Sequence, residues 1–184
     1  MIIACLGWGS LIWDPRKLEL RNNRPEAWHN DGPRMPIEYA RVSSRERMTL
    51  VIVPRRRLVT VLWNEMKGDD IDRAIRSLRE REETDAVECW RSGANGDSTY
   101  ARRIGTWARR VGVDAVMWTA LSPKFGGRLG RIPSRAEVIK YLRPVEGVDR
   151  TEAERYVRRT PSQIKTRYRA AIESALGWTY DANF

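Results

Sequence analysis

The chain has 184 residues, of which 41% are hydrophobic and 32% charged. This length and balance predict one globular, soluble domain, residues 1–184, and exclude a disordered protein. No apolar run reaches the roughly 18 residues of a membrane span, and no basic leader precedes the first apolar residues, so we expect a cytoplasmic protein without a membrane partner. The two cysteines, Cys5 and Cys89, form neither a disulfide framework nor a metal-ligand spacing.

The charge is strongly positive, with a formal net value of +10 and a pI near 10.2. Such an excess is compatible with nucleic acid, an acidic substrate or an anionic surface. The arginines are scattered, and the densest group, Arg55–Arg57, lies between two strand-like runs and favours a solvated turn. We therefore rank nucleic-acid binding lowest among the functions considered.

Strands dominate the first part of the chain. Apolar and β-branched runs predict strands over residues 2–6, 37–43, 48–53, 58–63, 87–90 and 115–121. Polar or glycine-rich stretches predict loops over residues 14–36, 92–98 and 122–133.

Helices follow later in the chain. One is expected to open at Gly68-Asp69-Asp70, and a second lies over residues 100–111. Capping-box patterns predict three further helix starts, at Ser134, Thr151 and Thr160, and the last helix should end near Gly177. Strands first and helices later, with little alternation, indicate an α+β fold.

A glycine turn follows the first strand, with the sequence Gly-Trp-Gly-Ser at residues 7–10. It is not a dinucleotide fingerprint, because the third glycine of G-x-G-x-x-G is missing. It is not a Walker loop either, because no Gly-Lys-Ser/Thr follows. Free backbone N–H groups at a strand end can bind a carboxylate or phosphate. On the local sequence alone, an ordinary tight turn is the favoured alternative.

Two polar groups lie on predicted apolar helix faces. Ile71, Ile75, Leu78 and Glu82 follow helical spacing, so Glu82 should extend to solvent, pair with a cation, or occupy a pocket with a raised pKa. Tyr168 is the one polar-tipped residue on the stripe that it shares with Ile164, Ile172 and Ala175. A buried tyrosine hydroxyl normally has a hydrogen-bond partner, and its role is more often structural than catalytic.

Three segments together resemble a known family. The Leu-Gly-Trp-Gly-Ser-Leu-Ile-Trp segment at residues 6–13 resembles the opening motif of the gamma-glutamylcyclotransferase superfamily. The Leu-Arg-Glu-Arg-Glu segment at residues 78–82 and the Pro-Ser-Gln-Ile-Lys-Thr-Arg-Tyr segment at residues 161–168 resemble two later motifs of its ChaC-like branch, in the family's order. The Arg-Met-Thr-Leu-Val run at residues 47–51 is similar to the family's second central strand.

The resemblance implies a small mixed β-barrel flanked by helices, and an enzyme that needs no metal or cofactor. The implied reaction cyclises a gamma-glutamyl amine or peptide to 5-oxoproline and releases the amine. By the same resemblance, Glu82 is the catalytic acid and base, and the substrate-binding residues are Gly7, Trp8, Gly9, Ser10, Leu11 and Tyr168.

The chain departs from the family at two places. Trp8 replaces the usual tyrosine, and Glu83-Thr84-Asp85 stands where the family has Gly-Gly-Tyr after the catalytic glutamate. These differences leave a second interpretation open, a non-catalytic small-molecule-binding module on the same fold. The sequence indicates neither the leaving amine nor the oligomeric state.

Overall fold

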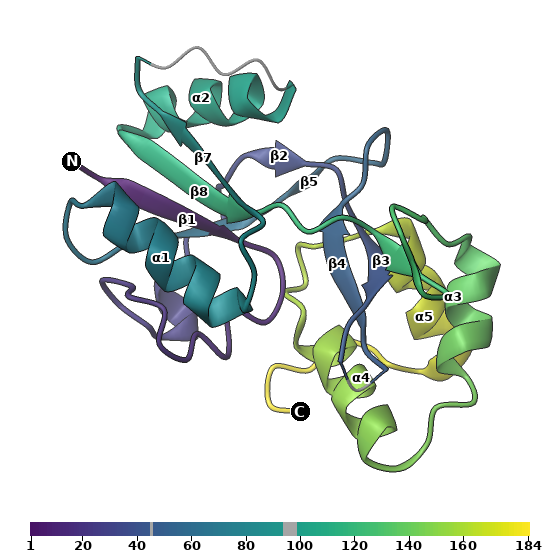
Figure 1. Ribbon diagram of the computed structural model, residues 1–184. Coiled ribbons are helices and arrows are strands. Elements are labelled where there is room, and N and C mark those ends of the chain that lie inside the picture. Colours follow the sequence, from purple (N-terminus) through teal and green to yellow (C-terminus); the bar gives the residue numbers. More distant parts are fainter. Residues whose placement is uncertain (45, 94–98) are drawn as a thin grey trace. The chain divides into compact units, whose positions relative to one another are not determined.

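The structure is a computed structural model that describes residues 1–44, 46–93 and 99–184 (Figure 1). The predicted loop over residues 92–98 therefore lies mostly outside the described residues. The chain divides into two compact units, which are described one at a time. Unit 1 contains residues 1–7, 11–35 and 60–121, and unit 2 contains residues 8–10, 36–59 and 122–184. The expectation of one domain stays a prediction.

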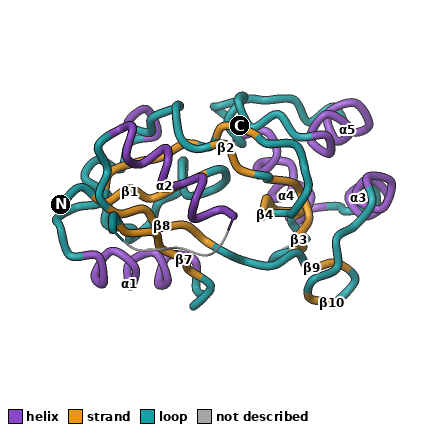
Figure 2. Tube along the Cα trace, turned by 90° about the horizontal axis from the view of Figure 1, so that it is seen from above, coloured by secondary structure: helices purple, strands orange, loops and turns teal. Residues whose placement is uncertain are grey.

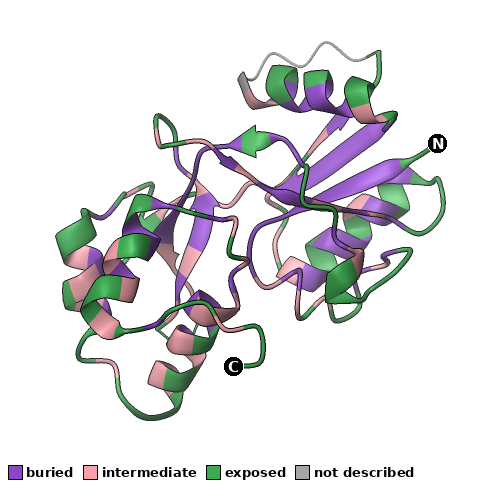
Figure 3. Cartoon of the chain, turned by 180° about the vertical axis from the view of Figure 1, so that it is seen from behind, coloured by how far each residue is buried: buried purple, intermediate pink, exposed green. Residues whose placement is uncertain are grey.

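The core of unit 1 is a four-stranded sheet in the order β6-β1-β8-β7. Strand β1 (Ile3–Gly7) pairs antiparallel with β6 (Leu62–Glu65) and parallel with β8 (Ala115–Thr119), and β7 (Val87–Arg91) pairs antiparallel with β8. Every residue of β1 and β8 is buried (Figure 3), which explains why both strands are nearly continuous apolar runs.

Two helices of unit 1 pack against β7 and β8 (Figure 1). Helix α1 (Ile71–Glu82) begins as predicted, because the Asp70 carboxylate accepts hydrogen bonds from the amides of Asp72 and Arg73. It ends where Glu83 takes a left-handed conformation, with φ of 52°. Helix α2 (Thr99–Val111) buries Ile104, Trp107 and Ala108, in agreement with the predicted helix. A single 3₁₀ turn, η1 (Pro25–Ala27), interrupts the long polar stretch.

Unit 2 is built on a second four-stranded sheet, in the order β10-β9-β3-β4. Strand β3 (Ile37–Val42) pairs antiparallel with β4 (Met48–Ile52) and parallel with β9 (Lys124–Phe125), which forms a hairpin with β10 (Arg128–Leu129). Helix α5 (Arg167–Leu176) packs on β3, and α3 (Arg135–Leu142) packs on α5 (Figure 2). Helix α4 (Gly147–Arg159) buries Ala153, Tyr156 and Val157.

The α+β class is confirmed, whereas a barrel is not observed in the described strands. Both four-stranded sheets are mixed, as expected, but each is open, since its two outer strands pair with one neighbour only. The expected strand over residues 58–63 is two strands, β5 (Val59–Thr60) and β6. Between them the Val61 amide donates to the carbonyl of Pro33, and β5 pairs with β2 (Arg34–Met35) instead of joining the larger sheet.

The predicted loop at residues 122–133 contains the β9–β10 hairpin. Its two-residue turn is Gly126-Gly127, with φ values of 55° and 74°. Positive φ at both central residues is the requirement of the tight turns that join antiparallel strands. The glycines that indicated a loop therefore make a hairpin turn.

One of the three predicted capping boxes is correct. Ser134 and Glu137 form the reciprocal bonds of a capping box at α3. Thr151, in contrast, lies inside α4, where its hydroxyl donates to the carbonyl of Gly147. Thr160 ends α4 rather than beginning a helix, because its hydroxyl donates to the Tyr156 carbonyl, and α5 starts six residues later with Thr166 as its N-cap.

Among the residues that the structure describes, no helix is both long enough and apolar enough to cross a membrane.

Candidate functional site

The two glycines of the turn lie against aromatic side chains of the chain itself. A Cβ on Gly7 would lie 2.5 Å from Cζ3 of Trp28, and a Cβ on Gly9 would lie 2.3 Å from the hydroxyl oxygen of Tyr156. Both separations are too short for any side chain, so close packing alone requires glycine at each position. What approaches the backbone at these two points is therefore a tryptophan and a tyrosine.

Trp8 is held within unit 2 by a short chain of hydrogen bonds. The indole N–H of Trp8 donates to the Leu50 carbonyl at 3.2 Å, and the Leu50 amide donates to the Tyr156 hydroxyl at 3.2 Å. Trp8 and Leu11 are buried, while Ser10 is half-buried in the turn that begins there. That this segment binds a substrate stays a prediction.

Glu82 lies at the edge of the buried face of α1. The residues that α1 buries are Ile71, Ala74, Ser77, Leu78 and Arg81. Glu82 is half-buried, with 17% of its side chain exposed, whereas the side chain of Arg81 is only 5% exposed. The face is therefore rotated from the predicted one, and it places the arginine inside and the glutamate at the rim.

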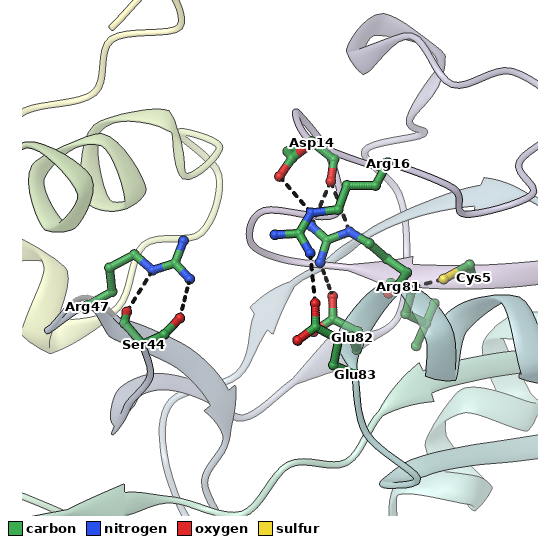
Figure 4. Close-up of polar contacts among 9 residues, drawn as sticks. Cys5, Asp14, Arg16, Ser44, Arg47, Arg81, Glu82 and Glu83 are labelled. Carbon is green, nitrogen blue, oxygen red and sulfur yellow. Dashed lines mark hydrogen bonds and ion pairs between the residues drawn. The ribbon is translucent and has the colours of Figure 1, made fainter.

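Arg81 joins Glu82 to the chain segment that follows the glycine turn (Figure 4). Its Nε and Nη2 atoms donate to the main-chain carbonyl of Asp14 at 2.9 and 2.7 Å, and its Nη1 atom donates to Oε1 of Glu82 at 2.9 Å. A planar guanidinium can make these bonds at once in a fixed geometry. Of the three expected arrangements of Glu82, the structure shows the pairing with a cation.

Arg16 and Cys5 lie near this ion pair (Figure 4). Arg16 bridges Oδ2 of Asp14 at 3.4 Å and Oε1 of Glu83 at 3.3 Å, in an exposed position where ion pairs add little stability. On the inner side lies Cys5, whose thiol is fully buried. Burial raises the pKa of the Cys5 thiol, and the negative charge of Glu82 raises it further, so this thiol stays protonated and unreactive.

Tyr168 is buried in unit 2, and its hydroxyl has partners within that unit. It donates to the Pro133 carbonyl at 2.8 Å and accepts from Nη2 of Arg56 at 2.8 Å, and the Arg56 guanidinium lies 5.1 Å from the centre of the ring. Burial raises the pKa of the Tyr168 hydroxyl. The expectation of a solvated arginine turn therefore holds for Arg55 and Arg57, which are exposed, but Arg56 turns inward.

Glu38 is a buried carboxylate that the sequence analysis did not identify. Its Oε1 accepts from the Tyr39 amide at 3.0 Å, and its Oε2 accepts from the Tyr168 amide at 3.4 Å, in the first turn of α5. Burial raises the pKa of the Glu38 carboxyl, although the Thr166 side chain, these amides and the charge of Arg56 oppose the shift. The negative group at a helix start supports a structural role for Glu38.

No group of three or more histidine, cysteine, aspartate or glutamate side chains within the described ranges is arranged to hold a metal ion. The arrangement best suited to acid–base chemistry is the Arg81–Glu82 pair, because Arg81 holds the half-buried Glu82 carboxylate in a fixed orientation. Arg81 itself could have been found from the sequence, because it lies three residues after Leu78 and seven after Ala74, on the buried face of α1.

The chain was compared with protein-family models, with curated proteins and with solved structures, and none of the three comparisons gave a match.

Proposed function

We propose that the chain is a gamma-glutamylcyclotransferase-like enzyme, which converts a gamma-glutamyl amine or peptide to 5-oxoproline and releases the amine. One observation carries the proposal. A half-buried carboxylate, Glu82, is held by the buried Arg81, whose remaining bonds go to the main chain at Asp14, just after the glycine turn. Glu82 is also the residue to which the sequence resemblance assigns acid–base catalysis. The cytoplasmic location is part of the same proposal.

The reaction requires proton transfer but no outside nucleophile. The substrate's α-amine attacks its own γ-carbonyl, so that a carbon–nitrogen bond closes a five-membered ring and the carbon–nitrogen bond to the leaving amine breaks. Such an intramolecular attack benefits from effective molarities of up to ~10⁵–10⁸ M. Glu82 accepts the proton that the attacking amine loses and delivers it to the leaving nitrogen, a cycle that one carboxylate can perform alone.

The sequence resemblance assigns substrate binding to residues 7–11 and to Tyr168. Gly7 and Leu11 belong to the same unit as Glu82, and Trp8, Gly9 and Ser10 belong to unit 2. Backbone N–H groups of this segment would bind the gamma-glutamyl carboxylate or the developing oxyanion. Gamma-glutamyl peptides are anionic, and the positive net charge of the chain is compatible with such a substrate but does not by itself support it.

The test is release of 5-oxoproline from a panel of gamma-glutamyl amines and peptides by the purified protein. Glu82→Gln keeps the size and polarity of the side chain but removes the base, so we expect kcat to fall about 10²–10⁴-fold. Glu80→Gln is the matched control, because Glu80 lies on the same helix and is exposed. Absence of product from the whole panel, or equal activity of the two variants, contradicts the proposal.

A second candidate is a binding module that holds a gamma-glutamyl compound without turning it over. Two observations favour it: Oε1 of Glu82 is already bound by Arg81, and Glu83, in a left-handed conformation, follows where the family has glycine. Calorimetry separates the two functions. Saturable binding of a gamma-glutamyl compound without any 5-oxoproline would support the module, whereas product formation excludes it.

A further inference from the structure

The positive charge of the chain belongs to one unit. Unit 2 contains 19 lysines and arginines against 9 aspartates and glutamates, which leaves +10, whereas unit 1 contains 15 of each and is neutral. The basic residues are divided 19 to 15 between the units, so the surplus arises mainly because unit 2 has 9 acids whereas unit 1 has 15. A surplus confined to one unit indicates an acidic partner for that unit.

A groove of unit 2 lies on the outer face of helix α3. It has a volume of about 600 Å³ and is lined by Ala136, Ile139, Lys140, Arg143 and Pro144. Ala136, Ile139 and Lys140 lie on one face of α3, its C-cap Arg143 continues the same spacing, and Pro144 follows the helix. The other face of α3, with Val138 and Leu142, is buried. The groove thus combines an aliphatic floor with two exposed cations.

The two cations of the groove have no ion pair within 4.0 Å among the described residues, since neither Lys140 nor Arg143 takes part in a salt bridge. Residues 124–143 contain six lysines and arginines and a single acid, Glu137. That acid is engaged elsewhere, because it pairs with Arg131 and accepts from the Ser134 amide at the start of α3. The charge of the groove is therefore available to an external anion.

The chemistry of the groove selects among acidic partners. A concave aliphatic floor with a charged rim is the usual anatomy of a site that receives an amphipathic helix. Single-stranded nucleic acid is bound by aromatic side chains on which bases stack, and the lining contains none. A membrane surface is flat and is contacted by protruding apolar residues rather than by a groove.

We propose that the outer face of α3 is a docking site for an acidic amphipathic helix of another protein. The apolar side chains of that helix pack on Ile139, Ala136 and Pro144, and its carboxylates pair with Lys140 and Arg143. Helix α3 has eight residues and is about 12 Å long, which matches about two turns of a docked helix. The site shares no residue with the Arg81–Glu82 pair and does not depend on the proposed reaction.

The experiment measures the fluorescence anisotropy of labelled synthetic peptides of about 14 residues, a length at which helices become marginally stable. The first peptide carries leucines at helical spacing and glutamates elsewhere. The second has glutamine for each glutamate, and the third has alanine for each leucine. We expect saturable binding of the first peptide alone, and weaker binding as the ionic strength rises from about 50 to about 200 mM.

Charge-reversed variants locate the site. Lys140→Glu combined with Arg143→Glu should weaken binding of the first peptide at least tenfold. Arg102→Glu combined with Arg103→Glu is the matched control, because these arginines are exposed on α2 in the neutral unit, and it should leave binding unchanged. All four side chains are exposed, so both variants should fold like the parent, which circular dichroism verifies.

Several results overturn the inference. These are no binding of the first peptide at low salt, equal binding of the glutamine or alanine peptide, and equal losses in the two double variants. Tighter binding of a single-stranded RNA or of phosphatidylserine vesicles, with the same sensitivity to Lys140→Glu and Arg143→Glu, would identify another class of partner and also reject the proposal.

Discussion

A methyl group added at Gly9 tests the packing of the glycine turn. In Gly9→Ala the new Cβ would lie 2.3 Å from the hydroxyl oxygen of Tyr156 and 3.1 Å from its Cζ atom. Tyr156 is buried and cannot turn into solvent, so its hydroxyl must move away from position 9. That movement breaks the bond in which the Leu50 amide donates to this hydroxyl.

Gly9→Ala lowers the free energy of unfolding in two ways. Overpacking of a close-packed interior by one methyl group costs about 1–3 kcal/mol. Leaving the buried Leu50 amide without its acceptor costs about 1–3 kcal/mol more. We therefore expect Gly9→Ala to lower the free energy of unfolding by about 2–5 kcal/mol, a large share of the stability of an ordinary domain.

A double-mutant cycle with Tyr156→Phe measures the contact directly. Urea denaturation followed by tryptophan fluorescence gives the free energy of unfolding of each variant. Tyr156→Phe removes the oxygen that the methyl group meets, so Gly9→Ala should cost about 1–3 kcal/mol less in that background. If the two changes add to within about 0.5 kcal/mol, the hydroxyl is not what requires glycine at position 9, and the packing argument fails.

Three other changes test the remaining contacts. Arg81→Leu removes the donor to the Asp14 carbonyl and the cation that pairs with Glu82, so urea denaturation should show a loss of about 3–5 kcal/mol, whereas Arg79→Leu, at an exposed position, should change little. Tyr168→Phe loses both of its hydroxyl bonds and should cost about 1–3 kcal/mol in the same assay, and an unchanged value would mean that these bonds do not stabilise the fold. Burial raises the pKa of the Glu38 carboxyl above its ordinary 4.5, so the folded chain holds this proton more tightly than the unfolded chain. The parent should therefore lose thermal stability relative to Glu38→Gln as the pH rises from about 4 to about 7, and a constant difference between their melting temperatures would contradict this assignment.

The periodic elements of the fold could be predicted because their patterns are local. Strands β1, β3, β4, β7 and β8 and helices α1, α2 and α5 lie where apolar spacing places them. Thr160 shows where local reasoning fails. Its hydroxyl could have capped a helix beginning at the following proline, but it accepts from the hydroxyl of Tyr39, 121 residues away in the sequence. A bond of that separation leaves no trace in the local pattern.

The sequence predicted only part of the candidate site, again because some of its contacts join residues that are far apart in the chain. Helical spacing indicated that Glu82 lies near the apolar face of α1, and it is half-buried there. The spacing from Ala74 and Leu78 also fits Arg81, but this residue was not recognised, because an arginine is counted as polar although its long apolar stem can lie inside. Its burial depends on a carbonyl acceptor at Asp14, which the fold alone supplies. Glu38 was missed likewise, since the amides that satisfy its carboxylate belong partly to α5.

The position of β1 in its sheet has a consequence for biosynthesis. The strand is buried throughout and lies between β6 and β8, which follow it in the chain by about sixty and more than one hundred residues. The ribosome synthesises β1 well before either neighbouring strand, so this apolar segment is exposed and lacks its strand partners during much of translation. We therefore expect folding of unit 1 to be limited by the closure of these long loops, and chaperones to engage the nascent chain at this strand.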